Sequence, residues 1–159
     1  MKFLVLFLLL FLYGCKYHDV EDYSLVLGVS IDYENEGLVM GFEILERENE
    51  SYFVMVKGNS IEECFDRLDK ENPAVPYLNH CSIVIIGKEY AERGIMPLLE
   101  YIMHDPDFRL KTNIVVSTDL ARDVLKHKGP GYKIIANDIS MAFELALNKT
   151  NIVDPVAVF

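Results

Sequence analysis

The sequence predicts an α+β domain in which helices pack against a mixed, largely antiparallel β-sheet. Three observations predict this class. Three aliphatic segments near the N-terminus are separated by short polar turns, a helix with a strong N-terminal signal follows them, and residues 81–86 form an almost unbroken apolar run. The remaining segments predict further helices and one more strand, which leads to the element order βββ-α-β-α-α-β-α-α.

The first three strands are expected at residues 24–33, 38–45 and 51–56, where β-branched, aromatic and aliphatic residues predominate. Gly28 lies inside the first of them, at a position typical of a bulge or of close approach by another segment. The turn signal Glu34-Asn35-Glu36-Gly37 connects the first pair, and a short charged loop connects the second. Connections this short join antiparallel neighbours, so the three strands are predicted to form a β-meander.

A helix is predicted to begin after Ser60. Ser60 and Glu63 fit the S-x-x-E capping box, in which two side chains satisfy backbone N–H groups at a helix start. Asn72-Pro73 ends the helix, because the residue before a proline is disfavoured in helical conformation. The apolar residues recur at i, i+3, i+4 and i+7 and form one face, namely Ile61, Cys64, Phe65 and Leu68.

The apolar run at residues 81–86, Cys-Ser-Ile-Val-Ile-Ile, predicts a strand that is covered on both faces. One or two helical turns are expected over Lys88–Arg93, ending at Gly94. Pro97 suits the first position of a further helix, which His104-Asp105-Pro106 stops. The predicted inward face of that helix consists of Leu98, Leu99, Ile102 and Met103.

The C-terminal part is predicted to contain a strand at residues 109–116 and two helices. Thr118 is expected to cap the first helix, which continues through Lys126 with a basic C-terminus. Its inward residues are predicted to be Leu120, Ala121, Val124 and Leu125. The second helix is expected at residues 137–147 and is predicted to bury Ile139, Phe143, Ala146 and Leu147.

The N-terminus is typical of a bacterial lipoprotein. Lys2 precedes an apolar run of the size of a signal-peptide core, about 7–15 residues, which is shorter than the roughly 20 residues of a membrane-spanning helix. Leu12-Tyr13-Gly14-Cys15 follows and looks like a lipobox. We therefore expect residues 1–14 to be a signal peptide, Cys15 to be lipidated, and residues 15–23 to be a lipid-proximal linker. The alternative is an uncleaved apolar anchor with an incidental cysteine.

The charge balance excludes some partners. Lys and Arg number 15 against 25 Asp and Glu, a net charge of −10, and removal of a signal peptide containing Lys2 makes the charge one unit more negative. Nucleic-acid binding requires a cationic surface, so no nucleic-acid partner is expected. Adhesion to anionic lipid is disfavoured for the same reason. Membrane attachment is therefore expected through a diacylglycerol and an acyl chain, such as palmitate, on Cys15.

No catalytic or metal-binding constellation is visible in the sequence. Cys64 and Cys81 are interpreted as small core residues, with a disulfide between them as the alternative. His80 could be a metal ligand or a proton carrier, but no second ligand stands at metal-ligand spacing. Two adjacent pairs look like acid/base pairs, namely His18-Asp19 and His104-Asp105, but neighbouring side chains point in different directions, so no catalysis is expected there. Asp32 and Glu34 are interpreted as turn and solubility residues. We therefore predict no enzyme, no cofactor and no metal site, and ligand-binding residues stay open.

Two blocks carry a pattern of a known family. In the first, Gly14-Cys15 precedes an acidic stretch at residues 19–22 and the strand Leu25–Asp32. The family's strand ends in Gly-x-Asp, and here Ser30 replaces the glycine before Asp32. The second block combines several elements, namely His80, the strand ending at Gly87, the motif Glu89-x-Ala91-x-x-Gly94, Asp105-Pro106, Arg109 and the Ala-x-x-Val-Leu helix at 121–125. In these blocks the chain resembles the Ger(x)C family, the lipid-anchored C subunits of spore germinant receptors.

The resemblance implies a non-enzymatic role in spore germination, with the membrane-embedded A and B subunits as partners, at the outer face of the inner spore membrane. It also suggests a structural role for His80 at a strand entrance. It assigns residues 24–147 to the family's N-terminal domain, and residues 148–159 to the start of a linker or a next domain in a chain expected to be truncated. Two alternatives stay open, which are a stand-alone solute-binding lipoprotein and a non-functional fragment. The germinant, the partner contacts and the oligomeric state do not follow from the sequence.

Overall fold

The computed structural model describes residues 23–35, 37–47, 50–109, 111–127 and 133–150, with side chains as far as residue 146. Within these ranges the chain forms six strands and five helices. The strands are β1 (Tyr23–Glu34), β2 (Gly37–Arg47), β3 (Glu50–Gly58), β4 (Val75–Tyr77), β5 (Ile83–Gly87) and β6 (Asn113–Ser117). The helices are α2 (Ile61–Glu71), α3 (Lys88–Arg93), α4 (Met96–His104), α5 (Ala121–Lys126) and α6 (Ile135–Thr150).

The strands form one mixed sheet in the order β3-β2-β1-β5-β6. The meander β1-β2-β3 is antiparallel, as predicted, whereas β5 and β6 run parallel to β1. The short strand β4 was not predicted, and it pairs in parallel with the beginning of β1. The predicted α+β class with a mixed sheet is confirmed.

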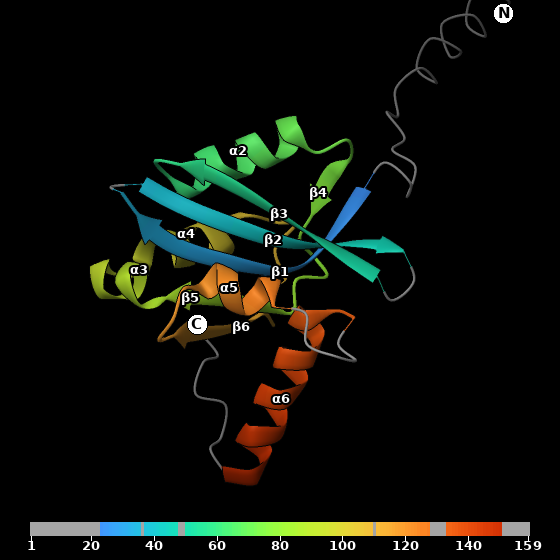
Figure 1. Ribbon diagram of the computed structural model, residues 1–159, viewed down its shortest axis with the longest axis vertical. Coiled ribbons are helices and arrows are strands. Elements are labelled where there is room, and N and C mark those ends of the chain that lie inside the picture. The colour runs from blue at the N-terminus through green and yellow to red at the C-terminus, as the bar shows by residue number, and fades with distance from the viewer. Residues whose placement is uncertain (1–22, 36, 48–49, 110, 128–132, 151–159) are drawn as a thin grey trace, which may run out of the picture.

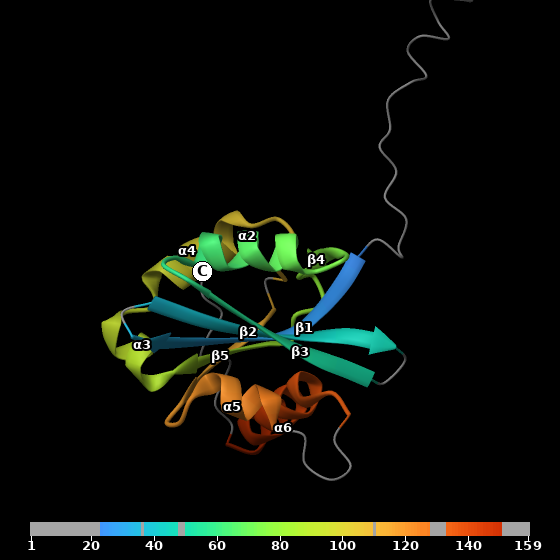
Figure 2. The same cartoon turned by 45° about the horizontal axis from the view of Figure 1, so that its top comes forward.

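Helices cover both faces of the sheet, with α2 and α4 on one side and α5 and α6 on the other (Figure 2). Strand β5 shows that both faces are buried, because its side chains alternate between two apolar clusters. Val84 and Ile86 belong to the larger cluster under α2 and α4, and Ile83 and Ile85 belong to the smaller one under α5 and α6. The apolar run therefore forms the strand covered on both faces that the sequence predicts.

The predicted capping box at the start of α2 is present. The Ser60 hydroxyl accepts a hydrogen bond from the backbone N–H of Glu63, at 3.2 Å. The Glu63 carboxylate accepts from the backbone N–H of Asn59, at 2.8 Å, one residue before the expected partner. The apolar face of α2 packs on the sheet, and its half-buried Phe65 stacks on Tyr101 of α4 with ring centroids 4.7 Å apart.

Both internal cysteines are buried and free, so the disulfide alternative is wrong and their interpretation as core residues is confirmed. Burial raises the pKa of the Cys64 thiol to about 11 and that of the Cys81 thiol to about 12. Both groups therefore stay protonated at neutral pH, and protonated thiols react slowly.

Several predictions near the helices need correction. The inward residues of α4 are Leu98 and Ile102, whereas Leu99 is half-buried and Met103 is exposed. Strand β6 starts at Asn113 and not at residue 109, because two turns precede it. In these turns the Phe108 N–H donates to the carbonyl of Asp105, and the Thr112 N–H donates to that of Arg109.

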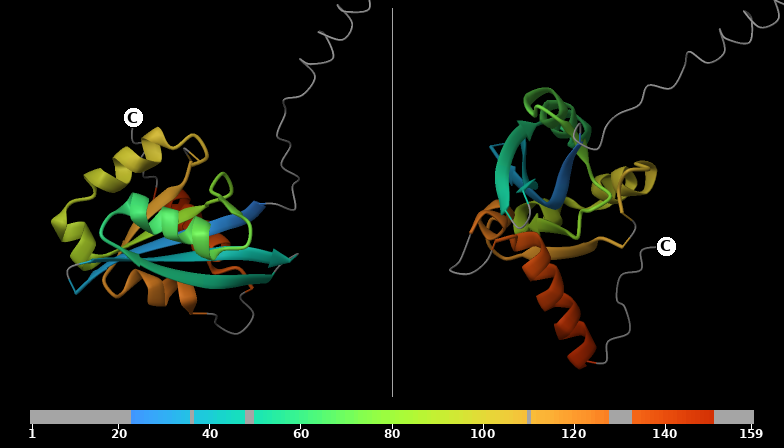
Figure 3. Two further views of the ribbon diagram at one scale, coloured as in Figure 1. Left: turned by 90° about the horizontal axis from the view of Figure 1, so that it is seen from above. Right: turned by 90° about the vertical axis from the view of Figure 1, so that its right-hand side faces the viewer.

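The last helix also differs from its prediction. It starts at Ile135, two residues earlier, and buries Ile135, Ala136 and Ser140 near its beginning. Ile139 and Phe143 are half-buried and Ala146 is exposed, while the side chain of Leu147 lies outside the described residues. The reason is geometric, since α6 runs away from the sheet after its first turns (Figures 1 and 3).

Candidate interaction surface

Helices α5 and α6 lie on one face of the sheet, and each begins at a buried carboxylate that a strand supplies. The first helical N–H groups have no partner within a helix, and the helix N-terminus carries a partial positive charge. A carboxylate placed at the helix start accepts hydrogen bonds from these N–H groups, and its negative charge interacts favourably with the partial positive charge. Glu43 of β2 serves α6 in this way, and Asp32 of β1 serves α5.

Glu43 is 1% exposed and accepts three hydrogen bonds. One oxygen accepts from the backbone N–H of Ile135, at 2.8 Å, and from the hydroxyl of Ser51, at 2.6 Å. The other oxygen accepts from the backbone N–H of Ala136, at 2.6 Å. The carboxylate therefore ties the start of α6 to strands β2 and β3. Glu43 is not among the residues predicted from the sequence, because one charged residue in a strand is normally expected to face solvent.

Asp32 is 2% exposed, so its interpretation as a turn and solubility residue is wrong. Its two carboxylate oxygens accept from the backbone N–H groups of Ala121 and Arg122, at 2.8 and 2.9 Å. The Arg122 guanidinium then pairs with Glu34, at 3.1 Å. The prediction that Thr118 caps this helix is wrong as well, since the chain enters α5 through Leu120 without a side-chain cap of its own.

The inward residues of α5 also differ from prediction. Ala121 and Leu125 are buried, as expected, but Val124 is half-buried and Leu120 is 41% exposed. Gly28 of β1 allows α6 to approach the sheet closely, because a Cβ built on it would lie 2.6 Å from the Cβ of Ala136. The register between β1 and β2 also shifts between Val26 and Gly28. Both readings of this glycine, bulge and close approach, are therefore confirmed.

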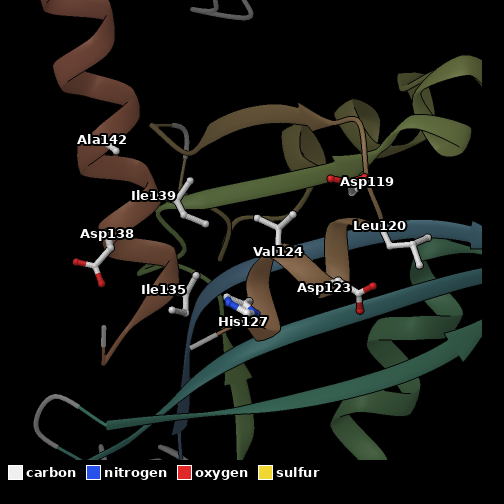
Figure 4. A pocket seen from close by; sticks show the side chains of 9 residues that line it. All are labelled: Asp119, Leu120, Asp123, Val124, His127, Ile135, Asp138, Ile139 and Ala142. Carbon is white, nitrogen blue, oxygen red and sulfur yellow. The ribbon is translucent and has the colours of Figure 1, made fainter. Parts of the chain in front are cut away.

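A groove of about 750 Å³ separates α5 from α6. Figure 4 shows Val124 of α5 and Ile135 and Ile139 of α6 directed into the space between the two helices. The residues that line it recur at helical spacing on each side, namely Leu120, Asp123, Val124 and His127 of the α5 segment, and Ile135, Asp138, Ile139 and Ala142 of α6, together with Asp119. The groove is therefore the surface between two helix faces.

The floor of the groove is mainly apolar and its rim is acidic. Asp119 and Asp123 lie on the α5 side, and Asp138 lies on the α6 side (Figure 4). His127 is the basic side chain among the described lining residues, which include neither Lys nor Arg. The apolar surface continues beyond the groove along α6, where Leu145 is 59% exposed. Such a surface is typical of a protein contact.

The other residues singled out in the sequence do not assemble into a chemical site. His80 is exposed near the ring of Tyr77. The His104 ring nitrogen lies 2.7 Å from the carbonyl of Glu100, while Asp105 accepts from the backbone N–H of Asp107, at 2.8 Å. Among the described residues, no group of three or more His, Cys, Asp and Glu side chains is arranged to hold a metal. Cys15 and the pair His18-Asp19 lie outside the described residues.

Comparison with known proteins adds the family. The model of the spore germination protein N-terminal domain matches residues 16–158. No curated protein and no solved structure matches significantly. Within the described ranges, no helix has both the length and the apolar character needed to span a membrane. With the family match covering nearly the whole chain, the protein belongs to the Ger(x)C family of spore germination proteins, through that family's N-terminal domain.

Proposed function

We propose that this chain is a lipid-anchored, non-enzymatic C subunit of a nutrient-germinant receptor of the spore. Cys15 carries the lipid, and the domain lies at the outer face of the inner spore membrane beside the membrane-embedded A and B subunits. The observation that supports this most is the family match at residues 16–158, which begins directly after the lipobox Gly14-Cys15. We propose the A and B subunits as partners because the chain belongs to this family.

Physical arguments support this role. An anchor next to a short linker holds the domain close to the bilayer, so membrane-embedded partners meet it at a high effective concentration. The exposed apolar surface of α5 and α6 is suited to such a contact. The two buried carboxylates, Asp32 and Glu43, support a non-enzymatic role, because backbone N–H groups already occupy their oxygens.

The first test replaces the proposed lipid attachment site. Cys15→Ala removes the thiol, and because the mature chain is acidic it has no electrostatic attraction to anionic lipid. We expect the variant to move from the membrane fraction to the soluble fraction, measured by immunoblot, and intact-mass spectrometry to show loss of the lipid. Lys16→Ala is the matched control and should stay membrane-bound. Recovery of Cys15→Ala in membranes at the wild-type level would contradict the proposal.

A solute-binding lipoprotein is the rival, and the size of the α5–α6 groove favours it. About 750 Å³ lies within the range of small-molecule pockets, roughly 300–1,000 Å³. A thermal-shift screen with amino acids and sugars tests this alternative, since a ligand at 100-fold its Kd stabilises a protein by about 2.7 kcal/mol. If the chain is a receptor subunit whose groove contacts protein, no amino acid or sugar should shift its unfolding temperature. A saturable shift that Ala142→Arg abolishes would instead support solute binding.

A further inference from the structure

We propose that the α5–α6 groove binds a cationic amphipathic helix of a partner protein, with an apolar stripe flanked by Lys or Arg. This inference rests on the proposed function and names the kind of partner segment that its exposed surface takes. The side chains that line the groove stand at positions i, i+3, i+4 and i+7 of α6 and of residues 120–127, the segment that contains α5. A third helix presents its own ridge at the same spacing and fits between two such rows.

The floor of the groove provides space as well as apolar contact. Val124 and Ile139 are half-buried, so part of each side chain remains free to contact a ligand. Ala142 is an exposed groove residue with the smallest side chain that a helix favours, and it leaves room for a neighbouring backbone. Leu145 is one turn farther along α6 and extends the apolar surface beyond the groove. The contact surface is thus elongated, as a helix requires.

The charges select a cationic partner. Asp119, Asp123 and Asp138 line the groove from both sides, and neither Lys nor Arg stands among the described residues that line it. None of these three carboxylates has a salt bridge within the described part of the chain. Lys or Arg residues beside an apolar stripe would therefore meet unpaired opposite charges, which raises the association rate and excludes acidic helices.

The same charges disfavour other occupants. An anionic membrane surface would be repelled by the aspartates, so direct docking of this groove on lipid is not expected. A second copy of the chain, related by a twofold axis, would bring the same aspartates face to face. A cationic helix is the occupant that satisfies both the apolar floor and the acidic rim.

Binding of two synthetic peptides tests the inference. Each has about 18 residues, long enough for a stable helix, with leucines along one stripe and either lysines or glutamates beside it. The full-length lipidated protein is placed in nanodiscs of zwitterionic lipid, and binding is measured by fluorescence anisotropy with empty nanodiscs subtracted. We expect the lysine peptide to bind at least about tenfold more tightly than the glutamate peptide, and the difference to shrink in high salt.

Two variants locate the contact. Ala142→Arg places a bulky cation in the groove and should weaken the lysine peptide at least about tenfold. Met141→Arg is the matched control, because it adds the same group at the neighbouring exposed position of α6, which does not line the groove, and it should change affinity less than about twofold. Circular dichroism of both variants checks the fold.

Each outcome decides the inference. Equal binding of the two peptides, absence of binding, or equal effects of the two arginine variants would overturn it. None of these results affects the expectation that Cys15→Ala leaves the membrane, so the two proposals fail separately. If Cys15→Ala stays in the membrane while the lysine peptide binds the groove, the lipid-anchored function fails and the docking inference stands.

Discussion

Replacing Glu43 with alanine is expected to destabilise the domain by about 3–5 kcal/mol, among the largest effects of any single change in this chain. The carboxylate accepts hydrogen bonds from two backbone N–H groups of α6 and from Ser51 in a site that is 1% exposed. Alanine leaves these donors buried without that partner, at about 1–3 kcal/mol each, and leaves a cavity as well. Urea unfolding followed by far-ultraviolet circular dichroism, with the full chain in nonionic detergent, measures the loss.

Two controls separate the capping role from a general effect of charge. Glu46→Ala removes an exposed carboxylate from the same strand and should change stability by less than about 0.5 kcal/mol. Glu43→Gln keeps the shape and one acceptor oxygen, so it should cost less than alanine. In Glu43→Ala, hydrogen exchange should show that the amides of Ile135 and Ala136 lose protection first. An effect of Glu43→Ala no larger than that of Glu46→Ala would show that the carboxylate does not hold α6.

Replacing Gly28 with alanine is expected to cost about 2–3 kcal/mol, because it adds a methyl group to a filled space. The new Cβ would lie 2.6 Å from the Cβ of Ala136 and 3.1 Å from Cδ1 of Leu125. The leucine methyl can shift by a few tenths of an ångström, but the Cβ of Ala136 moves only with the backbone of α6. The strain therefore has to displace α6 from the sheet. Urea unfolding, as for Glu43→Ala, measures the resulting loss of stability.

A double mutant tests whether this contact is the cause. Ala136→Gly alone should cost about 1 kcal/mol through helix propensity. Combined with Gly28→Ala, it removes the clash by exchanging the two side chains, so the double mutant should be more stable than the sum of the single effects predicts. Additive effects would mean that the cost of Gly28→Ala arises elsewhere, for example at the bulge between β1 and β2.

These predictions concern the surface on which the proposed function depends. Glu43 and Gly28 both set the position of α6, and α6 supplies one wall of the groove, including Ala142. A variant that loosens α6 should therefore weaken peptide binding even though it lies outside the groove. The packing of these helices on the sheet is in this way the physical basis of the candidate interaction surface.

Much of the fold follows from local sequence signals. The meander depends on segments rich in β-branched, aromatic and aliphatic residues and on short turns, α2 on the capping box of Ser60 and Glu63, and the covered strand β5 on its apolar run. The family also follows from local motifs, because the residues of Glu89-x-Ala91-x-x-Gly94 and of Asp105-Pro106 stand next to one another in the chain. Each of these signals acts between neighbouring residues, so the sequence reveals it directly.

The candidate surface was decided by contacts between residues far apart in the chain. Asp32 caps a helix that begins 89 residues later, and Glu43 caps one that begins 92 residues later. In the sequence both look like exposed strand or turn residues, because nothing nearby marks them as buried. The sequence by itself therefore determined the class, most elements and the family, whereas only the tertiary structure showed which carboxylates hold α5 and α6. The physical reason is that each carboxylate is stable in the core because one helix terminus, supplied by a distant segment, offers it backbone N–H groups.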